Sequence, residues 1–193
     1  MTGLLDRRAV TAELLKDRGD LLVVTGLGSP SYDAMAAGDH DHNYYLWAAM
    51  GSAATVGFGL AMSQRSRSVL VLTGDGEMLM GLGALATIGQ VLPPNLTFAV
   101  LDNGHYGETG MQQSHAGRGL ELSRMAAAAN FPWAKVVDDM DGVAELRDRI
   151  HARAGTSFAT VKIDVGEVDR VLPPRDGVYV KNRFRNALGH PTI

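Results

Sequence analysis

Short apolar runs alternate with longer amphipathic stretches along this chain. Four runs are typical of strands that are buried on both faces: 21–26, 68–73, 96–103 and 157–165. A fifth run, at 134–137, is shorter. Helices are predicted between them, in the stretches 6–18, 51–63, 77–91, 120–129 and 143–154. Strands that alternate with helices predict an α/β fold, a three-layer domain with a mainly parallel sheet and helices on both faces.

The predicted domain covers residues 1–172, and residues 173–193 form a basic C-terminal tail with little periodicity. With 193 residues and an apolar share of 46%, the chain can bury the core of one such domain. The tail is expected to cover either the domain or a partner. The glycine-rich stretch 26–43 is too long for an idle connection in a compact domain, so a functional loop is expected there.

Composition excludes several classes of protein. A net charge of -3 is not the basic footprint of a nucleic-acid-binding protein. The absence of cysteine excludes disulfides, iron–sulfur clusters and zinc sites with thiolate ligands. The N-terminal residues lack the apolar core of a signal peptide, and no apolar run is suited to span a membrane. We therefore expect a cytoplasmic protein with neither a nucleic-acid nor a membrane partner.

Two polar loops follow predicted strands and carry candidate metal ligands. Asp75 lies in the sequence GDG after the strand 68–73, and Asn103 ends the next strand. They are separated by one strand–helix–strand unit, so the ends of the two strands would lie about 5 Å apart if these strands are neighbours. A carboxylate and an amide oxygen at one edge of the sheet suit Mg²⁺ or Ca²⁺ better than zinc.

The flanking residues add a phosphate site to this metal site. Gly74 and Gly76 allow a close backbone approach, and a helix that starts near Glu77 would offer free N–H groups to phosphate oxygens. The two loops together predict a diphosphate held through a divalent metal. Either loop alone is also typical of an ordinary turn, and GDG alone is equally compatible with a strand-to-helix turn capped by the aspartate.

These motifs resemble those of the thiamine-diphosphate-dependent decarboxylases. GDG at 74–76 and LDNGHYG at 101–107 are similar to the cofactor-binding motif of that family, and NYYLWAAMGSAATVGFGLAM at 43–62 resembles the segment that precedes it. The resemblance extends over residues 21–165 and is closest to sulfopyruvate and phosphonopyruvate decarboxylases. It implies thiamine diphosphate and Mg²⁺ as cofactors and a small 2-oxo acid as substrate.

The resemblance also implies roles for individual residues. Mg²⁺ would be bound by the side chains of Asp75 and Asn103 and by the main-chain oxygen of His105. The Ala48 carbonyl and the Met50 N–H would face the aminopyrimidine, with Met50 as the apolar wedge under the cofactor. The diphosphate would be held by Gly74, Gly76, Glu77, Tyr106 and Gly107. Because a carboxylate beside a diphosphate repels it, the side chain of Glu77 is expected to point away.

The catalytic residues are not identified in this chain. In the family, the cofactor lies between two domains, and this chain has length for the diphosphate-binding domain alone. The resemblance therefore implies a partner, a pyrimidine-domain (α-type) subunit that brings the glutamate to the pyrimidine ring, in a heterotetramer or larger assembly. His40 and His42 in the sequence DHDH are candidates for a proton relay, although such a pair is also typical of a solvated loop.

The expected function is that of the diphosphate-binding subunit of a split 2-oxo acid decarboxylase, with carboligation as a possible second outcome. The sequence identifies neither the 2-oxo acid nor the outcome. One alternative is the β subunit of a 2-oxoacid:ferredoxin oxidoreductase, which the absence of cysteine disfavours. Another is a non-catalytic cofactor-binding subunit, which the intact Met50, Asp75 and Asn103 disfavour.

Overall fold

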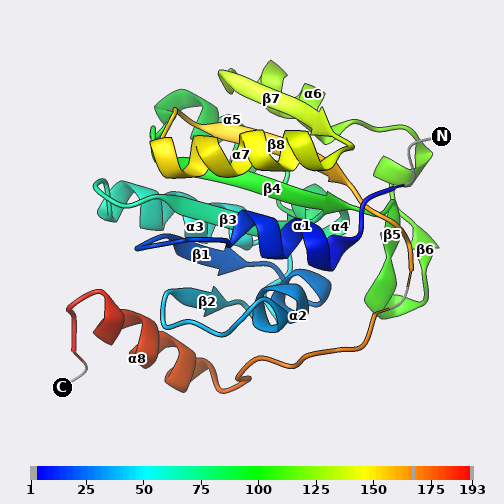
Figure 1. Cartoon of the computed structure of the whole chain (residues 1–193). Helices are drawn as coiled ribbons and strands as arrows, with labels where there is room; N and C mark the ends of the chain where they lie inside the picture. Colours follow the sequence, from blue (N-terminus) through cyan, green and yellow to red (C-terminus); the bar gives the residue numbers. More distant parts are fainter. Residues whose placement is uncertain (1–3, 167, 192–193) are drawn as a thin grey trace.

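The computed structural model describes residues 4–166 and 168–191 and contains a six-stranded sheet in the order β2-β1-β3-β4-β8-β7. Every pair of neighbouring strands is parallel. The strands are β1 (Leu22–Thr25), β2 (Asn43–Tyr45), β3 (Val69–Gly74), β4 (Leu96–Asp102), β7 (Trp133–Val137) and β8 (Ser157–Lys162). A separate hairpin of β5 (His105–Tyr106) and β6 (Gln112–Gln113) lies beyond the end of β4 (Figure 1). The predicted parallel sheet is confirmed.

Helices cover both faces of this sheet, as predicted (Figure 1). One face packs against α1 (Arg7–Leu14), α2 (Ser29–Ala36) and α7 (Met140–Ala152). The other packs against α3 (Ala53–Ser63), α4 (Asp75–Met80), α5 (Ala84–Val91) and α6 (Leu122–Ala128). Alternate residues of one strand serve the two faces: Leu70 and Leu72 join the first core, and Val69 and Val71 join the second. None of the helices in the described ranges is long and apolar enough to cross a bilayer.

Three local features differ from the sequence-based expectation. The helix predicted at 77–91 is two helices, α4 and α5, separated by a glycine-rich turn. A Cβ on Gly81 would lie 2.1 Å from the carbonyl oxygen of Gly51, so the backbones approach closely at this turn. The stretch 26–43, predicted as a loop, contains α2 and leads directly into β2. The strand β2 has only three residues, which is too short for a clear alternation of apolar positions.

The predicted basic tail contains a further helix, α8 (Gly177–Ala187). Its N-cap is Asp176, whose side chain accepts hydrogen bonds from the backbone N–H groups of Val178 and Tyr179. Val180 and Phe184, four positions apart, are buried, and Phe184 packs edge-on against Tyr44 of β2. The helix therefore covers the β2 edge of the sheet (Figure 1). The sequence-based expectation of a tail with little periodicity did not recognise the helical spacing of these two apolar residues.

Candidate functional site

A pocket opens at the carboxyl ends of β1, β3 and β4 and encloses about 730 Å³, including solvent at its mouth. β3 and β4 are neighbours, with Gly74 opposite Leu101, so the GDG and DNG loops lie side by side as predicted. The chain crosses from β1 to β2 on one side and returns to β3 on the other, which makes β1 and β3 the point where the strand order reverses. Open parallel sheets bind their ligands at such a position.

Nine of the residues predicted to hold cofactor or metal line this pocket: Met50, Gly74, Asp75, Gly76, Glu77, Asn103, His105, Tyr106 and Gly107. Ala48 is not among the lining residues; it precedes Met50 in a turn with a backbone φ of 55°. The structure thus brings most of the predicted set together. The roles of these residues in binding remain predictions at this point.

The carboxylate of Asp75 is 2% exposed, and its Oδ2 accepts a hydrogen bond from the hydroxyl of buried Ser114. Burial raises the pKa of Asp75 to about 6, and the nearby charge of Asp102 contributes in the same direction. A bound cation would stabilise the charged form of this carboxyl. The buried carboxylate therefore fits a metal ligand.

The second predicted ligand, Asn103, lies in a tightly held turn. Its Oδ1 accepts a hydrogen bond from the N–H of His105 at 2.9 Å, and its carbonyl oxygen lies 2.8 Å from Nδ1 of His105. The preceding Asp102 accepts a hydrogen bond from the N–H of Gly104 and pairs with Lys162. The oxygens of this turn and of Asp75 form a hard donor set of the kind that Mg²⁺ prefers.

The side chain of Glu77 is turned toward the loop after β1 and the start of α3. Its Oε2 accepts a hydrogen bond from the N–H of Leu27 at 2.7 Å, and its Oε1 accepts one from the N–H of Ala53 at 3.3 Å. Burial raises the pKa of this carboxyl, and the two backbone donors oppose the rise. A Cβ on Gly26 would lie only 1.9 Å from Oε2, so glycine is required beside the carboxylate. Glu77 thus joins the loop after β1, the start of α3 and the GDG turn.

A second glycine is required at the floor of the pocket. A Cβ on Gly76 would lie 2.4 Å from Cε1 of Tyr106. The tyrosine ring of the β5–β6 hairpin therefore rests directly on the GDG turn. Gly74 and Gly76 of this turn line the pocket.

Several lining residues were missed by sequence reasoning: Arg7, Leu27, Ser29, Pro30, Glu108 and Thr109. Ser29 begins α2, directly after Gly28 with its backbone φ of 77°. A glycine followed by a proline near the start of a helix is a recognisable signal, and it marks Ser29 as a second helix start at the pocket. Arg7 carries no such signal, because an arginine on an amphipathic helix is ordinarily solvated.

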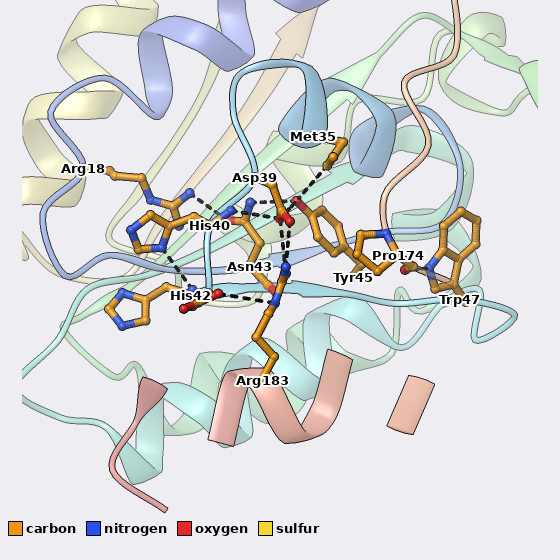
Figure 2. A network of polar contacts seen from close by, with 11 residues as sticks. Arg18, Met35, Asp39, His40, His42, Asn43, Tyr45, Trp47, Pro174 and Arg183 are labelled. Carbon is orange, nitrogen blue, oxygen red and sulfur yellow. Dashed lines mark hydrogen bonds and ion pairs between the residues drawn. The ribbon is translucent and has the colours of Figure 1, made fainter. Parts of the chain in front are cut away.

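His40 and His42 lie at the amino ends of the strands, whereas the pocket lies at their carboxyl ends. They precede β2, so strand rise alone separates them from Asp75 by about 20 Å. Figure 2 shows them beside a polar network in which Arg183 pairs with Asp39. The N–H of His42 donates a hydrogen bond to Nδ1 of His40 at 3.0 Å. The structure does not bring this pair to the pocket, which corrects the expectation of a proton relay there.

The same network holds α8 on the domain (Figure 2). Arg183 Nη1 lies 2.6 Å from Oδ2 of Asp39, and the hydroxyl of Tyr45 donates to Oδ1 of Asp39 at 2.8 Å. Arg18 donates to Oδ1 of Asn43 at 2.7 Å, and Nε1 of Trp47 donates to the carbonyl oxygen of Pro174 at 2.9 Å. The contacts of Arg183 and of Pro174 join the segment around β2 to the C-terminal part of the chain.

Comparison with known proteins gives a consistent picture. The family model "Thiamine pyrophosphate enzyme, C-terminal TPP binding domain" matches residues 28–161. The sulfopyruvate decarboxylase subunit beta of Methanothermobacter thermautotrophicus is 35% identical over 86% of this chain and 85% of its own length. A sulfopyruvate decarboxylase of Methanosarcina acetivorans is 31% identical over 94% of this chain, and a phosphonopyruvate decarboxylase of Streptomyces viridochromogenes is 35% identical over 89%.

These relatives differ in length. The chain spans 47% of the Methanosarcina protein and 43% of the Streptomyces protein, so it corresponds to about half of each. Among solved structures, a thiamine diphosphate-dependent 4-hydroxybenzoylformate decarboxylase of Rhodococcus jostii superposes with a TM-score of 0.69 at 18% identity. That match covers 87% of this chain and 34% of the solved chain, and at this identity it shows the shared fold alone.

Proposed function

Because the chain belongs to the thiamine pyrophosphate enzymes, as their C-terminal TPP binding domain, we propose that it holds thiamine diphosphate in the pocket at the ends of β1, β3 and β4. The observation that carries this proposal is the juxtaposition of two loops. Asp75 and Asn103 follow neighbouring strands and line one pocket, and Gly76 between the strands packs against the ring of Tyr106 with no room for a side chain.

In this proposal, Mg²⁺ binds the carboxylate of Asp75, the amide oxygen of Asn103 and the main-chain oxygen of His105. Mg²⁺ usually takes few protein ligands and completes its shell with phosphate oxygens and water. The hydroxyl of Ser114 orients the Asp75 carboxylate through its hydrogen bond to Oδ2. Burial of Asp75 favours a site that supplies a positive charge.

The remaining pocket residues orient the organic parts of the cofactor. The backbone of Gly74, Gly76 and Glu77 faces the diphosphate, and Tyr106 and Gly107 close the pocket over it. The carbonyl of Ala48 and the N–H of Met50 face the aminopyrimidine, with the Met50 side chain as the wedge beneath it. Glu77 keeps its carboxylate away from the phosphates because its two oxygens accept hydrogen bonds from Leu27 and Ala53.

We further propose that the chain is half of a split, Mg²⁺-dependent 2-oxo acid decarboxylase that acts on a sulfopyruvate-like or phosphonopyruvate-like substrate. The names of its relatives support this, and one relative of equal length is named as a subunit beta. The bound cofactor would supply an electron sink for cleavage of the bond between a keto carbon and a carboxylate. The partner would be a pyrimidine-domain subunit that contributes the glutamate at the pyrimidine ring.

A reconstitution assay tests this proposal. CO₂ release from sulfopyruvate, phosphonopyruvate and pyruvate is measured with thiamine diphosphate and Mg²⁺, with this chain alone and with a pyrimidine-domain subunit added. We expect no turnover by the chain alone and turnover of one of the acidic substrates by the pair. Strong activity of the lone chain would contradict the split arrangement, and turnover of pyruvate alone would contradict the substrate class.

A further inference from the structure

A largely buried arginine side chain lies at the end of the pocket away from Met50. The side chain of Arg7 is 11% exposed and lines the pocket together with Ser29, Asn103 and Gly107. It also lines an adjoining polar cavity, whereas Met50 does not. Met50 instead lines an apolar cavity on the other side, which Arg7 does not reach. Arg7 and Met50 therefore stand at opposite ends of the pocket.

The position of Arg7 is set by a fully buried carboxylate. Asp33 of α2 is 0% exposed, and its Oδ1 lies 3.4 Å from Nε of Arg7 and 2.6 Å from Nε of Arg8. One carboxylate balances the charge of only one of these two guanidinium groups. The three groups in contact carry two positive charges and one negative charge, and the exposed Asp6 acts on them only from a distance. A charge that is largely shielded from water is costly without a partner.

Arg7 and Arg8 differ in what else they contact. Arg8 also donates to the carbonyl oxygen of Asp169, and it does not line the pocket. Among residues 4–166 and 168–191, Asp33 is the one polar partner of the Arg7 side chain. The nearby acidic group Glu108 pairs with Arg170 at 3.1 Å. Of the two arginines bound to Asp33, Arg7 is the one placed to meet an anion in the pocket.

We propose that Arg7 binds the terminal phosphate of the cofactor and that Asp33 holds its guanidinium in position. This inference rests on the proposed function, in which the pyrimidine lies at Met50 and the diphosphate extends away from it. A guanidinium presents a planar fork that donates two parallel hydrogen bonds to phosphate oxygens. Arg7 would thereby distinguish the diphosphate from a cofactor that ends in a single phosphate.

A calorimetric titration compares thiamine diphosphate with thiamine monophosphate, both with Mg²⁺, on the wild-type chain, Arg7→Gln and Arg8→Gln, each with a pyrimidine-domain subunit added. We expect Arg7→Gln to weaken diphosphate binding about tenfold to a hundredfold and to leave monophosphate binding within about twofold. Arg8→Gln is the matched control, because it loses a contact to the same Asp33 but not a pocket residue. It should keep the wild-type preference for the diphosphate.

The outcomes separate this inference from the proposed function. If the wild type binds neither ligand, the proposed function fails and the inference fails with it. If the wild type binds the diphosphate and Arg7→Gln keeps the same preference, the inference alone is overturned. Equal losses in both variants would also overturn it, because they would indicate a purely structural role. Should Arg7→Gln not fold, Arg7→Lys keeps the charge without the fork and is expected to lose part of the preference.

Discussion

The carboxylate of Glu77 accepts a hydrogen bond from the main-chain N–H of Leu27 at 2.7 Å, across 50 positions of sequence. Its other oxygen accepts from Ala53, so one side chain joins the loop after β1, the start of α3 and the GDG turn. The loop after β1 and the GDG turn line the pocket, and α3 begins shortly after the lining residue Met50. The residue that first looked unfavourable beside a diphosphate is therefore placed to fix the relative positions of the segments around it.

Replacing Glu77 by Gln tests this bracing role. A glutamine amide turns an N–H₂ group toward at least one of the two backbone donors, so a buried N–H loses its acceptor. We expect the free energy of unfolding, measured by urea denaturation, to fall by about 1–3 kcal/mol. Glu145→Gln is the control, since that side chain is 49% exposed in its pair with Lys135 and should change stability by less than about 0.5 kcal/mol. Equal effects of the two substitutions would contradict the bracing role.

The packing of Tyr106 on Gly76 predicts a specific intolerance to a methyl group. Gly76→Ala would place Cβ 2.4 Å from the ring, which must then move out of its position over the turn. We expect a stability loss of about 1–3 kcal/mol together with weaker thiamine diphosphate binding. Gly59→Ala in α3 is the control, because a Cβ there meets nothing within 4 Å. It should stabilise the helix by about 0.5–1 kcal/mol. A similar response at both glycines would argue against a specific packing of Tyr106 on Gly76.

The raised pKa of Asp33 predicts that the stability of the fold depends on pH. Burial raises its pKa to about 6, against the opposing effect of Arg7 and Arg8, and Asp6 adds to the rise. The folded state then binds a proton more tightly than the unfolded state, so this contribution to stability is present near pH 4 and is lost as the pH rises through 6. The stability of the wild type relative to Asp33→Asn should fall by at most about 3 kcal/mol between pH 4 and 7. Parallel urea-unfolding curves for the two proteins across this range would disprove the shift.

The ion pair of Arg183 with Asp39 is predicted to hold α8 against β2. Its side chain is 10% exposed and pairs with Asp39 at 2.6 Å, next to the hydroxyl of Tyr45. Arg183→Met should release α8 from β2, with faster amide hydrogen exchange in both segments and a stability loss of about 1–3 kcal/mol. Arg185→Met, on the exposed side of the same helix, is the control and should leave exchange unchanged. Unchanged protection of α8 in Arg183→Met would show that Val180 and Phe184 hold the helix alone.

The pairing of the GDG and DNG loops could be predicted because β3 and β4 are long, mostly apolar, almost entirely buried and one crossover apart. The position of His40 and His42 at the amino ends of the strands could not be predicted. The strand β2 that follows them has three residues, too few to show an alternation of apolar and polar positions. Because β2 starts at Asn43 and runs parallel to β1, both histidines lie at the amino ends of the strands, opposite the pocket.

Arg7 and α8 escaped prediction for another physical reason. The approach of Arg7 to the pocket depends on how α1 packs across the sheet, and its buried partner Asp33 lies in the stretch 26–43, which the sequence predicts as a loop. The helix α8 has two buried apolar positions among charged residues, too few for a periodic signal. It is stabilised by the contacts of Phe184 and Arg183 with the β2 edge, which are long-range in sequence.

The most direct test of the account is the Mg²⁺ dependence of thiamine diphosphate binding to the wild type and to Asp75→Ala, each with a pyrimidine-domain subunit added, measured by calorimetry. The account predicts that the wild type binds the cofactor only with Mg²⁺ and that Asp75→Ala loses this binding by about a hundredfold or more. The melting temperature of the variant should not fall sharply, because the removed carboxyl is buried and has a raised pKa. Undiminished, Mg²⁺-dependent binding by a folded Asp75→Ala chain would contradict the assignment of this pocket as the metal and diphosphate site.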